Sequence, residues 1–158
     1  MTPSGVRSLI EEHGILPTPQ RVEIASILLE KPQHLSAEQL IERLKASASG
    51  VSKATVYNTL NLFSERGLVR EVNVDPVRKF YDSTTHPHHH FYNVDTGELA
   101  DIPDALVAFE QLPELPEGTE SESVEVLIRV RGRTWKFARN PFTNRALRLY
   151  CAPSQVPI

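Results

Sequence analysis

With 158 residues, 40% of them hydrophobic, and a formal net charge of −3, the sequence is that of a globular protein with room for one domain or two small ones. No apolar run approaches the roughly 18 residues of a membrane span, and no basic segment followed by an apolar core marks a secretory leader. We therefore expect a cytoplasmic protein without membrane contacts. The lone cysteine, Cys151, excludes an internal disulfide and any Cys-x-x-Cys zinc site.

The charge is distributed unevenly along the chain. Residues 1–84 carry ten basic and ten acidic side chains, whereas residues 85–131 carry two basic and ten acidic ones. Residues 132–158 carry five basic side chains and no acidic ones. This partition predicts two modules, 1–84 and 85–131, followed by a basic C-terminal tail, 132–158, to which we assign no role.

Four helices are predicted in the first module, with start or stop signals supplied by polar N-caps, an early proline and terminal glycines. Thr18 before Pro19 begins the second helix, and Ser36 with Gln39 forms a capping box at the start of the third. Apolar residues at helical spacing continue the helices, over residues 4–13, 19–31, 37–46 and 53–66.

The polar face of the fourth predicted helix differs from an ordinary solvated face, which usually carries more Glu and Lys. It has short hydrogen-bonding groups, one cation and one phenol near its N-terminal end. This composition favours a helix that enters the major groove of DNA, with Lys53 and the helix N-terminus at phosphates and Thr55 or Tyr57 at thymine methyls. A plain surface helix is the alternative. The candidate DNA-contacting residues here are Ser52, Lys53, Thr55, Tyr57, Asn58 and Asn61.

A two-stranded hairpin is predicted after the helices. Residues 68–74 alternate between apolar and polar, residues 75–78 read as a turn, and residues 79–82 follow as a second strand. Helices followed by a hairpin is the order of a winged helix, which gives an α+β fold class. Arg78 and Lys79 at the hairpin tip would reach the DNA backbone.

The second module is predicted to be a small α/β unit. A strand ending at Asn93 pairs through a turn with residues 98–102, Pro103 starts a helix with apolar residues up to Leu112, and residues 124–130 form a strand with one buried face. Such a unit is too small to be stable alone, so we predict that it pairs with a second copy in a homodimer.

The most distinctive stretch is His86-Pro87-His88-His89-His90, which holds four of the six histidines. On a strand, His88 and His90 would point to one face and His89 to the other. Two imidazoles on one face can bind one metal ion, since imidazole suits zinc, iron, copper and nickel. A solvated histidine tract is the alternative.

These stretches resemble the ferric uptake regulator (Fur) family of bacterial metal-dependent transcription factors. The matching residues are 16–21, 34–38, 54–60, 80–82 and the histidine stretch. Within the family the sequence is most similar to the iron response regulator branch, through residues 88–91, 101–103 and 115–118.

The resemblance implies an N-terminal winged helix-turn-helix domain joined to an α/β dimerisation domain, with a regulatory metal between them. Residue by residue, the implied metal ligands are His34, Asp82, His88, His90 and Asp101. A mixed set of imidazoles and carboxylates suits iron(II), manganese or zinc. The implied partner is double-stranded DNA with an A/T-rich palindromic operator, and Arg21 becomes a further candidate phosphate contact.

The sequence departs from the family pattern at three places. Asn93 and Gly97 flank the region where many members carry a Cys-x-x-Cys pair, so no four-cysteine structural zinc is expected. Asn58 replaces an arginine that many members carry after the tyrosine. Cys151 precedes Ala152, so the Cys-Pro haem motif of some iron response regulators is absent. Any haem would then bind through the histidine stretch. Within it, His86 and His89 are candidates for a second metal or haem site. The alternative is that both are ordinary surface histidines.

We therefore predict an iron-responsive repressor of genes for iron or haem homeostasis. A peroxide-sensing regulator of the same family is the alternative, because iron held by His and Asp can generate oxidants that modify its own ligands. A small metalloenzyme using His88, His90 and Asp101 is the rival from another class. The sequence has no evident nucleophile or base constellation, so we do not expect an enzyme.

Overall fold

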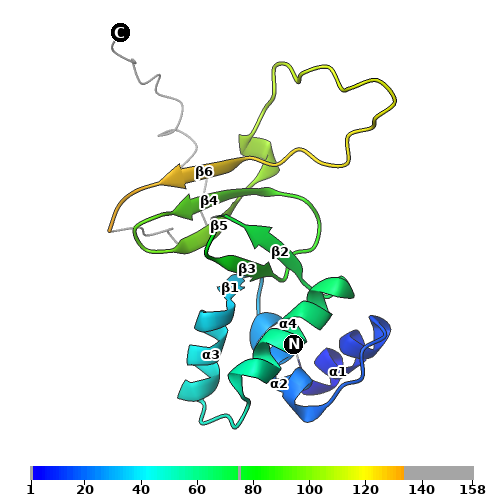
Figure 1. Cartoon of the computed structure of the whole chain (residues 1–158), viewed down its shortest axis with the longest axis vertical. Coiled ribbons are helices and arrows are strands. Elements are labelled where there is room, and N and C mark those ends of the chain that lie inside the picture. The colour runs from blue at the N-terminus through cyan, green and yellow to red at the C-terminus, as the bar shows by residue number, and fades with distance from the viewer. Residues whose placement is uncertain (1, 75, 134–158) are drawn as a thin grey trace.

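The computed structural model describes residues 2–74 and 76–133, so the predicted tail lies outside the described residues from position 134 on (Figure 1). The fold is α+β, as predicted. Its elements, in chain order, are α1 (Pro3–Glu12), α2 (Pro19–Leu28), β1 (His34–Ser36), α3 (Ala37–Ala46), α4 (Lys53–Glu65), β2 (Arg70–Asn73), β3 (Lys79–Asp82), β4 (His89–Asn93), β5 (Glu98–Ile102), the 3₁₀ turn η1 (Asp104–Leu106) and β6 (Leu127–Val130).

The helices begin at the predicted caps. Thr18, Ser36 and Ser52 are the N-caps of α2, α3 and α4. Both halves of the capping box form at α3, where the Gln39 N–H donates to Ser36 Oγ at 3.2 Å and the Ser36 N–H donates to Gln39 Oε1 at 2.8 Å. Gly67, with a φ of +71°, ends α4 in the left-handed conformation that glycine adopts without strain.

The apolar faces of the four helices enclose the main core. The side chains of α3 that the sequence predicts to be buried, at positions 37, 40, 41 and 44, are all buried. At the centre of this core lie Ile10, Ile24, Leu28, Leu40, Val56, Leu60 and Phe63, each no more than 1% exposed. The core fixes α3 and α4 against each other and leaves the N-terminal end of α4 at the surface.

The hairpin of the winged helix is part of a three-stranded sheet with the order β1-β3-β2. The predicted strands β2 and β3 pair antiparallel, and β1, which the sequence analysis missed, pairs with the other edge of β3. A strand of three residues is too short to show an alternating pattern. We call the part from α1 to β3 the N-terminal unit.

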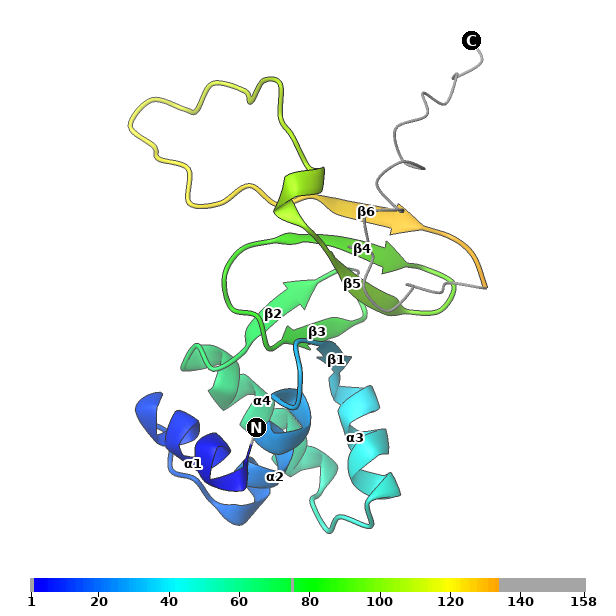
Figure 2. The same ribbon diagram turned by 180° about the vertical axis from the view of Figure 1, so that it is seen from behind.

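The C-terminal unit, β4 to β6, is a second three-stranded sheet with the order β5-β4-β6. The predicted β4–β5 hairpin forms, and β6 runs parallel to β4 on its other side. The two sheets lie one above the other, with the helices below (Figures 1 and 2). Val74, Phe80 and Tyr92 are buried between them, and the rings of Phe80 and Tyr92 pack edge to face with centroids 6.2 Å apart.

The prediction of a helix that begins at Pro103 is wrong. The structure has only η1 there, and no helix over residues 107–126. The apolar residues that suggested the helix remain exposed, Leu106 at 51%, Phe109 at 45% and Leu112 at 49%. Most of the stability of a short helix comes from burying its apolar face, and within the described chain this stretch is only partly covered.

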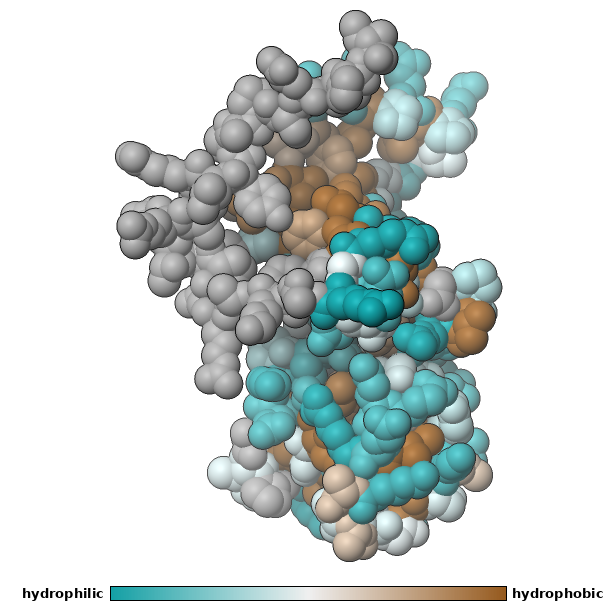
Figure 3. Space-filling view, turned by 90° about the vertical axis from the view of Figure 1, so that its left-hand side faces the viewer, coloured by the Kyte–Doolittle hydropathy of each residue, from teal (hydrophilic) through white to brown (hydrophobic). Residues whose placement is uncertain are grey.

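The last predicted strand is also only partly correct. It is limited to β6, and neither face is fully buried, since Leu127 and Val130 are half-buried and Ile128 is 39% exposed. Apolar surface therefore gathers on the C-terminal unit, where Figure 3 shows brown patches above a mostly hydrophilic helical part. Among the described residues, no helix is long and apolar enough to cross a membrane.

Replacing Phe80 by alanine tests the packing between the two sheets. The ring is 1% exposed, so the Phe80→Ala variant should lose about 3–5 kcal/mol of unfolding free energy. Val77→Ala, in the same hairpin but 89% exposed, should stay within about 0.5 kcal/mol of wild type. Urea unfolding at one fixed protein concentration, without added metal, measures both. Equal losses for the two variants would contradict the described packing.

Candidate metal centre

The five side chains predicted as metal ligands meet at the junction of the two units. One donor atom from each of His34, Asp82, His88, His90 and Asp101 lies within 4.8 Å of all the others. His34 and Asp82 come from β1 and β3 of the N-terminal unit. The other three come from the C-terminal unit, so the group draws on both parts of the chain.

Strand pairing explains why these residues converge. His34 lies opposite Asp82 in the β1–β3 pair, and His90 lies opposite Asp101 in the β4–β5 pair. Cross-strand partners share a face, so each pair presents an imidazole beside a carboxylate. His88 and His90 lie on one face as predicted, with ring centroids 4.3 Å apart.

The imidazoles surround the two carboxylates closely. Nε2 of His34 lies 3.2 Å from Asp82 Oδ2 and 2.9 Å from Asp101 Oδ1. Nε2 of His88 lies 3.1 Å and 3.0 Å from the same two atoms, and Nε2 of His90 lies 3.7 Å and 3.9 Å from them. Three ring nitrogens and two carboxylate oxygens therefore face one small space.

Several of these polar atoms are buried without a hydrogen-bond partner. His34 Nε2, His90 Nε2 and Asp82 Oδ2 all have this property. A buried polar atom without a partner is costly, and proteins rarely leave several side by side unless a ligand satisfies them. Donor atoms of this kind, converging on one point, fit a divalent cation.

Hydrogen bonds to backbone groups outside the donor cluster hold two of the ligands so that their remaining donor atoms face the centre of the site. The Nδ1–H of His88 donates to the carbonyl of His86 at 2.8 Å, which directs Nε2 inward. The backbone N–H of Thr84 donates to Asp82 Oδ1 at 2.7 Å, which leaves Oδ2 facing the imidazoles. Such outer contacts orient metal ligands. They come from backbone groups, so the sequence carries no signal for them.

The charges of the site are coupled. Burial lowers the pKa of His34, but the close contacts and negative charges of the Asp101 and Asp82 carboxylates outweigh it and raise that pKa to about 9. Burial raises the pKa of Asp82, yet His34 and His90 hold it well below its usual range. Burial also raises the pKa of Asp101, but His34 and His88 outweigh it and lower that pKa. Positive charge at this point is therefore strongly favoured.

The two histidines proposed for a second site lie in different surroundings, and a second site at these residues stays a prediction. His89 faces the other side of β4, where its Nδ1 accepts from the Val126 N–H at 3.1 Å and its ring lies edge-on to Phe109. His86 stands next to His88, with ring centroids 5.4 Å apart. Among the described residues, the group of metal-donor side chains includes neither His86 nor His89.

Comparison with known proteins agrees with this architecture. The sequence model of the ferric uptake regulator family matches residues 12–128. The chain belongs to the ferric uptake regulator family.

Two curated Fur-family relatives are named for peroxide. The peroxide operon regulator of Bacillus subtilis is 33% identical over 93 residues, and the peroxide-responsive repressor PerR of Staphylococcus aureus is 30% identical over 93 residues. Each alignment covers 59% of this chain and 64% or 63% of the relative, so the chain spans a little under two thirds of their length.

Solved Fur structures share the fold. The regulator from Pseudomonas aeruginosa, solved with manganese, superposes with a TM-score of 0.61 at 28% identity, covering 80% of this chain and 97% of that one. The regulator from Vibrio cholerae gives 0.64 at 23% identity, over 80% of this chain and 98% of that one. The fold is thus a winged-helix DNA-binding domain with a dimerisation domain. The similarity to the iron response regulator branch stays a prediction.

Helix α4 presents most of the candidate DNA-contacting residues at the surface. Ser52, Lys53, Tyr57, Asn58 and Asn61 are exposed, and Thr55 is half-buried with its hydroxyl 2.9 Å from Ser52 Oγ. The sequence analysis did not assign a role to Glu38 of α3, whose carboxylate accepts a 2.8 Å hydrogen bond from the Tyr57 hydroxyl.

Two of the candidates outside α4, Arg21 and Lys79, already have partners in the chain. Arg21, in the first turn of α2, donates to the carbonyl of Leu16 at 3.0 Å. Lys79 forms an ion pair with Glu71 across the hairpin at 3.0 Å. A phosphate contact by either residue would require these exposed interactions to be shared or exchanged.

Proposed function

We propose that this chain is a metal-dependent transcription regulator that binds double-stranded DNA as a homodimer and acts as a repressor. The observation that carries the proposal is the convergence of five metal-donor groups from both units, four of them buried or half-buried and Asp101 exposed, with three polar atoms left unpaired. Family membership supports a regulator rather than an enzyme. We place the division between the DNA-binding and dimerisation domains near residue 84, between β3 and β4.

In this proposal His34 and Asp82 would hold the ion from the N-terminal unit, and His88, His90 and Asp101 from the C-terminal unit. A bound iron(II), manganese or zinc ion supplies positive charge to the buried carboxylates. Because the donors belong to both units, their joint engagement fixes the angle between the units. In a dimer that angle sets the distance between two α4 helices, which must match half-sites about 34–36 Å apart or a multiple of that.

The exposed apolar surface of the C-terminal unit supports the homodimer. Leu106, Phe109, Leu112 and Ile128 are all more than a third exposed, although such side chains are usually buried. A three-stranded sheet of this size gains little stability alone. Pairing with a second copy would cover this surface and hold two DNA-binding units in one particle.

The metal-dependence of DNA binding is tested by removing one donor. A duplex selected by the wild-type chain from a random library with Mn²⁺ serves as the probe. His88→Ala should weaken Mn²⁺-supported binding about tenfold or more, because it removes one ligand and the alignment that depends on it. His86→Ala removes a neighbouring imidazole outside the donor group and should behave like wild type. Unchanged Mn²⁺ dependence in His88→Ala would contradict the proposed site.

The role of α4 is tested by truncating Tyr57. Tyr57→Ala should lower affinity for the selected duplex about tenfold or more, while its affinity for unrelated DNA at the same salt concentration stays unchanged. Glu65→Ala, exposed at the other end of α4, is the matched control. If Tyr57→Ala retained the preference for the selected duplex, α4 would not be reading bases through this residue.

Peroxide sensing is the second candidate function, favoured by the names of the Bacillus and Staphylococcus relatives. The iron-loaded protein should then lose DNA binding after brief exposure to hydrogen peroxide and gain one oxygen atom on a ligand histidine, read by peptide mass spectrometry. The manganese-loaded protein should be unaffected, because manganese(II) does not readily reduce peroxide. Full retention of binding by the iron-loaded protein would instead favour an iron-responsive regulator.

A further inference from the structure

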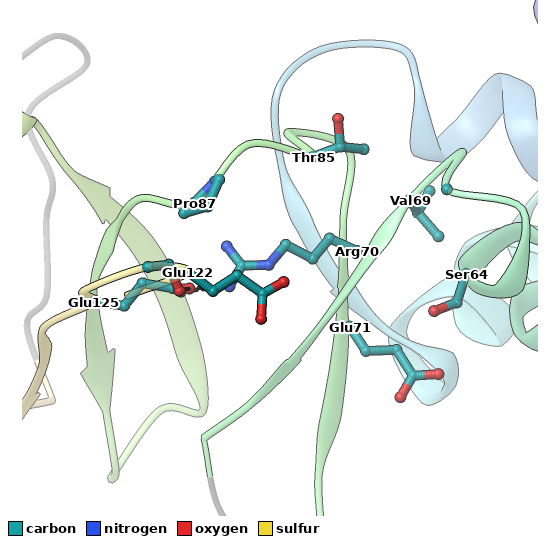
Figure 4. A pocket seen from close by; sticks show the side chains of 10 residues that line it. Ser64, Val69, Arg70, Glu71, Thr85, Pro87, Glu122 and Glu125 are labelled. Carbon is teal, nitrogen blue, oxygen red and sulfur yellow. Dashed lines mark hydrogen bonds and ion pairs between the residues drawn. The ribbon is translucent and has the colours of Figure 1, made fainter. Parts of the chain in front are cut away.

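An ion pair outside the metal-donor group also joins the two units. Nη2 of Arg70, on β2, donates to both carboxylate oxygens of Glu125, which lies 55 residues later and just before β6. Figure 4 shows the Arg70 side chain extending from β2 across the cleft toward Glu125. The two side chains are only 26% and 27% exposed, so the contact is partly shielded from water.

Each end of this ion pair is next to a metal donor. Arg70 lies directly opposite Asp82 in the β2–β3 pair. Glu125 precedes Val126, whose carbonyl accepts from the His90 N–H at 2.9 Å and whose N–H donates to His89 Nδ1. The ion pair therefore ties the strand pair that carries Asp82 to the strand that carries His90.

The energetics of the pair suggest that it fixes geometry more than it adds stability. Burial raises the pKa of Glu125, but the hydrogen bond and charge of Arg70 hold it below its usual range. At the same time Arg70 Nη1 is buried without a hydrogen-bond partner. The desolvation of such a guanidinium offsets much of the Coulomb attraction. What remains is a directional contact that restricts how the two units can move.

We propose that Arg70 and Glu125 are positioning residues for the metal centre, holding its two halves in alignment before an ion binds. The inference rests on the proposed metal-binding function. A site assembled from two units binds tightly only if its donors are already close to their final positions, because any reorganisation is subtracted from the binding free energy. The ion pair opposes a motion that would separate Asp82 from His90.

The test is titration calorimetry of the full chain with Mn²⁺, using two variants. Arg70→Met and Glu125→Gln should each weaken Mn²⁺ binding about tenfold. If charge alone mattered, the two variants would change Mn²⁺ affinity in opposite directions. Loss of the Arg70 cation would strengthen Mn²⁺ binding, and loss of the Glu125 anion would weaken it. A loss of Mn²⁺ affinity in both variants therefore shows that the ion pair acts by aligning the donor groups. Glu71→Gln is the matched control, because Glu71 pairs with Lys79 inside the same hairpin and does not bridge the units.

A second readout uses the metal-free protein. Amide hydrogen exchange over β6 and at His90 should be faster in Arg70→Met and Glu125→Gln than in wild type, and unchanged in Glu71→Gln. Wild-type Mn²⁺ affinity in both variants, or tighter binding by Arg70→Met, would overturn the positioning role. Failure of the wild-type chain itself to bind Mn²⁺ would overturn the proposed function, which separates the two failures.

Discussion

The carboxylate of Asp82 is fully buried, and three imidazoles and a second carboxylate surround it. A buried negative charge must be compensated locally, because water is not available to solvate it. Without a metal, the compensation comes from a proton on His34, whose pKa is raised by these same carboxylates. A divalent cation would replace that proton and also satisfy the unpaired nitrogens. The two units meet at this carboxylate, since Asp82 and His34 come from one of them and His88, His90 and Asp101 from the other.

Rigid elements link the metal-donor group to α4, the helix that would read DNA in the proposed regulator. His34 begins β1, and Ser36, the last residue of β1, is also the N-cap of α3. The position of His34 is thus tied by two residues of strand to the start of a helix. The α3 helix packs on α4 in the main core, and its Glu38 holds the Tyr57 hydroxyl. A shift of the ligands at the junction is therefore transmitted to a packed helix pair rather than absorbed by a loop.

The sequence predicted the elements whose signals are local. The caps at Ser36 and Ser52, the β4–β5 hairpin and the common face of His88 and His90 all follow from spacing within a few residues. The full ligand set did not, because His34, Asp82 and Asp101 are single polar residues whose convergence depends on strand pairing. Only the family resemblance brought them in. The helix at Pro103 failed for the opposite reason, since an apolar stripe predicts a helix only where another surface can bury it. Arg70 and Glu125, 55 residues apart, carried no signal at all.

Charge explains why the distance between two DNA-binding units would matter so much in the proposed regulator. The first 84 residues carry as many acids as bases, and α4 offers a single cation, Lys53, near its N-terminus. Few phosphate contacts make each unit a weak binder on its own. The acidic residues 85–131 would repel phosphates, which favours an approach of DNA from the winged-helix side. Useful affinity then requires both DNA-binding units of a dimer to bind one duplex. The effective concentration of the second unit falls steeply when the distance between the two units does not match the distance between the half-sites. In the proposed regulator, a small rotation at the Asp82 junction would therefore separate bound from unbound states without any change in the DNA-contacting surface itself.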